Sequence, residues 1–194
     1  LWENLVGRSR PFWQHFYSTL QSSFPDSLGD VDLERYYKAI NKCKPSLIRV
    51  EADEVTYNLH IIIRFELELA LLSGELSLDD LPAAWDSKYE TYLGIRPAND
   101  AEGVLQDIHW SMGAFGYFPT YSIGNLVSVQ FMNEARLALP DLEDQIAQGK
   151  FDGLLDWLRT NIYRHGSKFT PKELVQRVTG GPMDSGAYTS YLHD

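Results

Sequence analysis

The sequence has a single cysteine, Cys43. One thiol cannot form a disulfide within the chain. No second cysteine or nearby histidine cluster accompanies it, so a cysteine-based structural zinc site is also excluded. A chain without disulfides is typical of a reducing compartment, and we therefore expect a cytoplasmic protein.

Basic residues are also scarce, because 17 lysines and arginines stand against 27 aspartates and glutamates, for a formal net charge of −10. No run of basic residues interrupts the acidic excess. Binding to nucleic acid depends on neutralising phosphates, and docking on an anionic membrane depends on similar basic patches. The composition therefore predicts neither kind of partner.

Long apolar runs are missing as well. The most apolar segment, Val55 to Ser73, is too polar for a transmembrane helix, since it contains Asn58, His60, Arg64, Glu66 and Glu68. The first residues lack the basic and apolar regions of a signal peptide. The chain begins at Leu1, within an amphipathic segment, so we expect it to be part of a longer protein.

What the sequence does contain is helical periodicity. Val55 to Ser73 has Asp53 where an N-cap would fall and Gly74 as a stop, and Leu81 to Leu93 is followed by Gly94. Thr170, Pro171 and Glu173 form a capping-box pattern ahead of a helix that ends near Thr179. Shorter helices are expected over 1–22, 32–44, 103–113, 123–139, 142–148 and 152–164. Leu47 to Glu51 is the one expected strand, so the predicted fold class is mainly α with at most a small strand contribution.

Two polar stretches break this pattern. In the first, Arg49, Glu51 and Asp53 alternate with apolar residues just before the longest helix. Arg49 could bind a ligand carboxylate with two parallel hydrogen bonds while Asp53 holds it in place. An internal ion pair that ties the strand to the helix start explains the same spacing.

The second stretch runs from Gly103 to Trp110 and is followed by a tyrosine-rich segment that ends at Gly124. On a helix, Gln106, His109 and Trp110 would share one face. An imidazole and tyrosine hydroxyls can donate hydrogen bonds to a developing oxyanion. The alternative is a buried His109 bonded to Asp107 or to a backbone carbonyl, with Tyr117 and Tyr121 as ordinary core or surface aromatics.

These stretches carry a family resemblance. Residues 48–53, IRVEAD, resemble the I/V-R-x-x-A-D motif, and residues 103–110, GVLQDIHW, resemble the G-x-x-Q-D-x-H-W motif, of the carboxypeptidase Taq family of HExxH metallocarboxypeptidases. Both match at every fixed position and in the family's order. Residues 116–124, GYFPTYSIG, are similar to the family's G-Y-x-P-x-Y-x-L-G segment, with Ile123 in place of leucine. The resemblance covers essentially the whole chain.

The resemblance implies a metal in the intact protein, either zinc or another divalent ion such as cobalt. The family holds it with the two histidines of H-E-x-x-H and a glutamate of a later H-E-S/G-Q segment. No two of the five histidines here have such spacing. We therefore expect no metal ligand among these residues, and we expect the chain alone to lack both catalytic zinc and peptidase activity.

The resemblance also implies roles for individual residues. The chain would form the substrate-facing wall of an enzyme that releases single C-terminal residues from peptides. Arg49, with Asp53 as partner, would bind the terminal carboxylate. The hydrogen-bond donors near the scissile carbonyl would be His109, Tyr121 and Tyr117, and the remaining substrate-binding residues, which orient the others, would be Gln106, Asp107 and Trp110.

Two other classes of function remain open. One is a related HExxH endopeptidase or dipeptidyl peptidase, and the other is a non-catalytic helical interaction module. The resemblance further implies a homodimer, for which aromatic residues could supply interface anchors, namely Tyr36, Tyr37, Trp85, Tyr89 and Tyr92. Core packing is the more common use of such residues.

Overall fold

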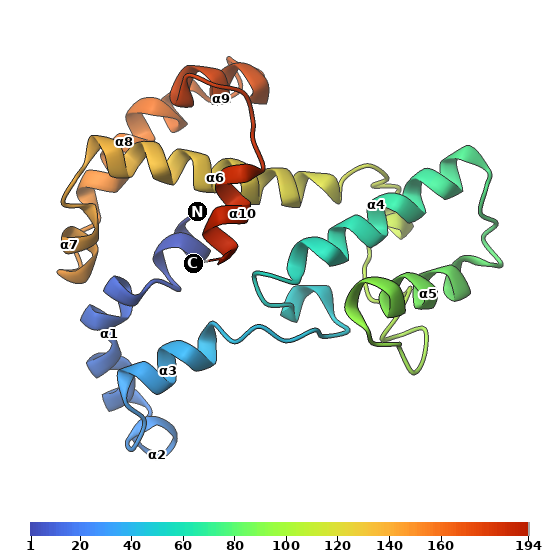
Figure 1. Cartoon of the computed structure of the whole chain (residues 1–194), viewed down its shortest axis with the longest axis horizontal. Helices are drawn as coiled ribbons and strands as arrows, with labels where there is room; N and C mark the ends of the chain where they lie inside the picture. Colours follow the sequence, from blue (N-terminus) through green and yellow to red (C-terminus); the bar gives the residue numbers. More distant parts are fainter. Residues whose placement is uncertain (194) are drawn as a thin grey trace. The chain divides into compact units, whose positions relative to one another are not determined.

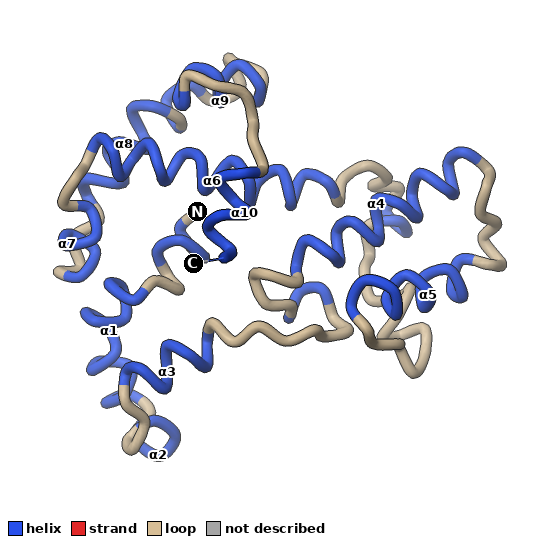
Figure 2. Tube along the Cα trace, in the orientation of Figure 1, coloured by secondary structure: helices blue, strands red, loops and turns tan. Residues whose placement is uncertain are grey.

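The computed structural model describes residues 1–193, which form two compact units. The terminal unit combines Leu1–Asn41 with the chain from Asn125 onward, and the inserted unit is Lys42–Gly124. In Figure 1 the terminal unit is coloured blue and yellow to red, and the inserted unit cyan to green. Figure 2 shows helices joined by loops, and the described residues include no strand. The mainly α fold class is confirmed.

The terminal unit packs its helices around an apolar core. Its elements are a π-helical turn Trp2–Val6, α1 Arg10–Ser23, α2 Pro25–Leu28, α3 Leu33–Ile40, most of α6 Pro119–Ala138, α7 Leu142–Ala147, α8 Asp152–Asn161, a 3₁₀ turn Tyr163–His165, α9 Pro171–Thr179 and α10 Gly186–His193. The core is made mainly of aliphatic side chains together with Met132 and Tyr188, and it includes Ile146, Leu154 and Leu158.

Side-chain caps start three of these helices. Ser9 accepts from the Phe12 N–H at the start of α1, and Asp32 accepts from the Arg35 N–H at the start of α3. The capping box predicted at Thr170 is present. Such caps satisfy backbone N–H groups that have no partner within the helix.

The inserted unit is built on two long helices. Its elements are a 3₁₀ turn Arg49–Glu51, α4 Tyr57–Ser73, α5 Leu81–Leu93, a 3₁₀ turn Trp110–Met112 and the first turns of α6. α4 and α5 pack together through Ile63, Leu67, Trp85 and Tyr89. Gly74 and Gly94 end the two helices with φ of 78° and 68°, a left-handed conformation that glycine adopts without steric cost.

Two of the predicted elements are wrong for one shared reason. Residues 103–113 form turns rather than a helix, and Leu47–Glu51 is an extended approach to a 3₁₀ turn rather than a strand. The carboxamide of Gln106 accepts from the Arg49 N–H at 2.9 Å and donates to the Leu47 carbonyl at 3.0 Å. A neighbouring strand would bind the same two backbone groups of Leu47 and Arg49. The Gln106 side chain takes the place of that strand, and the turn that carries Gln106 does not continue as a helix.

Other differences are smaller. The helix predicted over 1–22 is interrupted between Val6 and Arg10, and α2 and α10 were not predicted. No helix among the described residues is long and apolar enough to cross a membrane.

Candidate functional site

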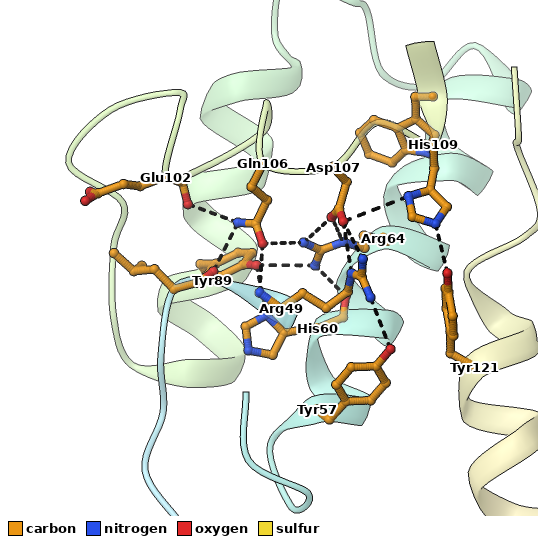
Figure 3. Close-up of polar contacts among 12 residues, drawn as sticks. Arg49, Tyr57, His60, Arg64, Tyr89, Glu102, Gln106, Asp107, His109 and Tyr121 are labelled. Carbon is orange, nitrogen blue, oxygen red and sulfur yellow. Dashed lines mark hydrogen bonds and ion pairs between the residues drawn. The ribbon is translucent and has the colours of Figure 1, made fainter. Parts of the chain in front are cut away.

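The inserted unit contains a buried cluster of two arginines and one aspartate, which we call the arginine cluster (Figure 3). Asp107 binds Arg49 and Arg64 through its two oxygens, each with a shortest N–O distance of 2.6 Å. Arg64 is 0 % exposed and Arg49 is 6 % exposed. The formal charge of the three side chains together is +1. A buried excess of positive charge favours binding of an anion.

The bonds of Arg49 leave part of its guanidinium available. Its Nε and Nη2 donate to Asp107 Oδ1 at 3.0 and 2.6 Å, and its Nη1 donates to the Tyr57 hydroxyl at 3.1 Å. These bonds use three of the five N–H groups of an arginine. A ligand carboxylate could therefore be bound without breaking them.

The partner predicted for Arg49 is wrong. Asp53 accepts hydrogen bonds from the backbone N–H groups of Lys44, Val55 and Thr56, and from the Thr56 hydroxyl. It therefore organises the turn that leads into α4, whose N-cap position is held by Thr56. Asp107, which lies 58 positions after Arg49, is the ion-pair partner that the spacing had assigned to Asp53.

The charges of the cluster reinforce one another. Burial opposes ionisation of Asp107, but the hydrogen bonds and positive charges of Arg49 and Arg64 outweigh it, so the pKa of Asp107 is lowered. Burial likewise opposes the charge of Arg49, yet the bond to Asp107 raises the pKa of Arg49. The ion-paired form of the cluster is therefore the stable one over the ordinary pH range.

Gln106 connects the cluster to the backbone. Its Oε1 accepts from Arg64 Nη2 at 2.8 Å in addition to the Arg49 N–H, and its Nε2 donates to the carbonyl oxygens of Leu47 and Glu102. Gln106 and Asp107 therefore both bind Arg49 and Arg64, Gln106 through the Arg49 backbone N–H; their orienting role remains a prediction.

His109 lies beside the cluster. Its Nε2 is 3.1 Å from the Tyr121 hydroxyl, while its Nδ1 is 3.9 Å from Asp107 Oδ1, which is too far for a hydrogen bond. The ring packs on Phe118 with centroids 4.3 Å apart. The alternative of a histidine hydrogen-bonded to Asp107 is therefore not what the structure shows, and the Nε2 of His109 pairs instead with Tyr121.

The two tyrosines predicted for the site differ in setting. Tyr121 is half-buried on the first turn of α6, and its ring lies 5.2 Å from the Arg49 guanidinium carbon. Burial raises the pKa of the Tyr121 hydroxyl, although the charge of Arg49 opposes the rise. It is therefore protonated at neutral pH and can donate. Tyr117 is 51 % exposed, with its ring 5.8 Å from that of His109.

Trp110 is directed to another part of α4. Its indole Nε1 donates to Glu68 Oε1 at 2.8 Å, and its ring packs edge-on against Trp85. The shared helix face predicted for Gln106, His109 and Trp110 is therefore wrong, because the three side chains contact different partners.

The sequence analysis missed the residues of α4 that hold the site. Figure 3 shows Arg64 and His60 of α4 and Tyr89 of α5 among the residues that surround Arg49. His60, Arg64 and Glu68, here called the polar stripe, are all buried. Their four-residue spacing places them on one helix face, and that spacing within an apolar segment was the available signal.

His60 is buried in its neutral form. Its Nδ1 is 3.0 Å from the Tyr89 hydroxyl, and its Nε2 has no hydrogen-bond partner among the described residues. Burial, together with the positive charges of Arg64 and Arg49, lowers the pKa of His60 to about 4. An uncharged imidazole is thus compatible with the two nearby guanidinium groups.

A metal site requires several ligands close together. Within residues 1–193, no group of three or more histidine, cysteine, aspartate or glutamate side chains is arranged to hold a metal ion. These residues do not fit a catalytic metal, and we derive no catalytic step through one from them.

Comparisons with known proteins agree on one family. The family model described as Carboxypeptidase Taq (M32) metallopeptidase matches residues 1–194. Thermostable carboxypeptidase 1 of Thermus thermophilus is 53 % identical over 191 residues, which are 98 % of this chain and 37 % of that protein. Carboxypeptidase 1 of Bacillus subtilis is 42 % identical over 98 % of this chain and 38 % of its own length.

Solved structures give the same result. The M32 carboxypeptidase from Deinococcus radiodurans R1 matches with a TM-score of 0.95 and 48 % identity, covering 99 % of this chain and 39 % of that one. A Pyrococcus furiosus carboxypeptidase matches with a TM-score of 0.95 and 42 % identity, covering 99 % of this chain and 38 % of that one. The chain thus spans about two fifths of the length of these relatives.

Proposed function

This chain belongs to the carboxypeptidase Taq (M32) metallopeptidase family, and on that premise we propose that the intact protein releases single amino acids from the C-termini of peptides. The observation that carries the proposal is the arginine cluster, in which Arg49 keeps free N–H groups within a buried group of net charge +1. A peptide's terminal carboxylate is an anion of matching geometry for a guanidinium group.

In this proposal the groups beside Arg49 act on the scissile bond. With the carboxylate on Arg49, His109 and Tyr121 are the donors nearest to the peptide carbonyl that precedes it, because both lie beside the cluster. The bond between His109 Nε2 and the Tyr121 hydroxyl uses one proton; with His109 donating it, the Tyr121 hydroxyl proton would stabilise the negative charge that develops on that oxygen. Tyr117, whose ring lies 5.8 Å from that of His109, would be a further hydroxyl donor to the same oxygen.

The intact enzyme would also use a divalent metal, which we propose to be zinc or cobalt. Its chemistry is the supply of an activated water, and its ligands would come from sequence outside these residues. The chain's own residues bind and orient the substrate. We accordingly propose that residues 1–194 alone retain no zinc after dialysis and release no amino acids.

The homodimer and the cytoplasmic location are also part of the proposal. Of the five aromatic anchors suggested for a dimer, Trp85 and Tyr89 are core residues that are 1 % and 0 % exposed, so those two are excluded as anchors. Tyr36 packs on Trp13 and Tyr17, whereas Tyr92 is 36 % exposed. Analytical ultracentrifugation of the intact protein would test the dimer.

The test of substrate binding compares Arg49→Ala with Arg49→Lys in the intact protein. Loss of the guanidinium should weaken cleavage of free-acid peptides by about 2–3 kcal/mol in kcat/KM, the usual loss for a charge-assisted bond. Arg49→Lys should recover only part of the lost kcat/KM, because an ammonium group cannot donate two parallel hydrogen bonds to one carboxylate. The matched control is Arg96→Ala, an exposed arginine of the same unit that pairs with Asp86 at 3.3 Å.

Three results would contradict this proposal. One is an unchanged ratio of activity on free-acid over C-terminally amidated peptides in Arg49→Ala. Another is product analysis that finds dipeptides or internal fragments, which would favour the endopeptidase or dipeptidyl class. The third is a wild-type protein with bound metal and no peptidase activity, which would favour the interaction module.

A further inference from the structure

Glu68 is a buried carboxylate whose partners are both uncharged. It is 2 % exposed and lies one helical turn after Arg64 on α4. Trp110 Nε1 donates to its Oε1 at 2.8 Å, and the Gly116 N–H donates to its Oε2 at 3.0 Å. Each oxygen of the carboxylate is therefore bound by a different end of one loop.

Burial of a carboxylate without a cation is unfavourable for stability. Its desolvation costs several kcal/mol, and an apolar side chain of similar volume generally packs in such a place at least as well. A buried glutamate at position 68 is therefore poorly explained by folding energy alone. What it does provide is a fixed arrangement of the groups bound to it.

Those groups flank the site. The two bonds close residues 110–116 into a loop pinned on α4, and the residues just outside the two anchor points are His109 and Tyr117. Gly116 has φ of 80°, a left-handed conformation that lets its N–H reach the helix. Trp110 also stacks on Phe115 within the loop, with centroids 5.9 Å apart. A shift of either anchor would move a proposed catalytic group.

We propose that Glu68 is a positioning residue, which sets His109 and Tyr117 for catalysis by holding both ends of the loop between them. This role rests on the carboxypeptidase function proposed above. It requires two acceptor oxygens, because two N–H donors converge on the side chain. Glutamine offers one acceptor, and its NH₂ group would face a second donor.

The experiment measures kcat and KM of the intact, metal-loaded protein for wild type, Glu68→Gln and Glu66→Gln. Glu66 is the matched control, because it lies on the same helix and also accepts two side-chain hydrogen bonds, from Lys88 and Tyr92, away from the loop. For Glu68→Gln we expect kcat to fall about 10- to 100-fold, as displacement of catalytic groups does, with KM changed by less than about threefold. Glu66→Gln should stay within about twofold of wild type in both constants.

A second readout does not depend on activity. In protein labelled with ¹⁵N-tryptophan, the indole N–H resonance of Trp110, assigned with Trp110→Phe, should move in Glu68→Gln and stay in place in Glu66→Gln. If Glu68→Gln does not fold, Glu68→Asp, which keeps the charge but shortens its reach, is measured by the same two readouts and should show the same kcat loss.

The outcomes separate the two proposals. A moved Trp110 resonance with unchanged kcat would make Glu68 a structural residue only and would overturn the positioning role. An unchanged resonance would overturn it as well. An inactive wild-type protein would instead refute the carboxypeptidase function, and the role of Glu68 would fall with it.

Discussion

The two units of the chain bury different kinds of side chain. In the terminal unit the buried residues are apolar or aromatic, whereas all the buried polar and charged residues of the described chain belong to the inserted unit, namely Arg49, Thr56, His60, Arg64 and Glu68. An apolar core is stabilised by burial alone, but a polar core is stable only if each group is paired. The inserted unit therefore depends on its hydrogen bonds and ion pairs for stability more than the terminal unit does.

The largest effect should come from Asp107→Asn. The change removes the one negative charge of the arginine cluster without a change in volume, so two buried guanidinium groups lose their counter-ion. We expect a loss of about 3–5 kcal/mol of unfolding free energy, measured by urea denaturation, and a loss of peptidase activity.

Leu154→Ala in the terminal unit is the control for that change. Its side chain is 0 % exposed in an apolar core, so it should cost about 2–5 kcal/mol through cavity formation. The kinetic constants of the folded enzyme should be unchanged. Loss of less than about 1 kcal/mol in Asp107→Asn, or a kinetic defect in Leu154→Ala, would remove the distinction between the units.

Lowering the pH should reduce the free energy of unfolding through His60, which belongs to the inserted unit. The pKa of His60 is about 4 in the folded state and about 6.5 in the unfolded chain, so the unfolded state binds more protons between these values. Stability should therefore fall by roughly 3 kcal/mol as the pH drops from about 6.5 to about 4. Urea unfolding at several pH values across this range measures the loss of stability. In the His60→Gln variant the free energy of unfolding should depend less on pH.

The location of the acid effect distinguishes the units further. Amide hydrogen exchange should show protection lost first in α4 and α5, while α7 and α8 keep theirs. Equal loss in both units, or a His60→Gln variant with the same pH dependence as wild type, would show that His60 is not the cause.

The smallest effect concerns a surface cap of the terminal unit. Thr170 accepts from the Glu173 N–H at 3.3 Å, and Glu173 accepts from the Thr170 N–H at 2.8 Å. Thr170→Ala should cost about 1 kcal/mol in thermal or urea unfolding and leave activity unchanged. Thr170→Ser, which keeps the hydroxyl, is the control and should stay close to wild type; a similar loss in both variants would show that the cap hydroxyl is not responsible.

The sequence by itself determined the features that depend on neighbours along the chain. Helix periodicity and caps predicted α5 at Leu81–Leu93 and the capping box at Thr170, because their signals lie within a few residues of one another. The motifs around Arg49 and His109 indicated the family.

Only the tertiary structure decided which residues hold the site. Arg49 is paired with Asp107 rather than with Asp53. On α4, Arg64 binds Asp107 and Glu68 binds Trp110, although the polar residues of that segment had been used only to exclude a membrane span. The physical reason is that a buried charge takes the partner that folding brings within hydrogen-bond distance, and distance along the chain does not determine that partner. The same holds for backbone groups. The side chain of Gln106, which is distant in sequence, binds the Arg49 N–H and the Leu47 carbonyl where a strand had been expected.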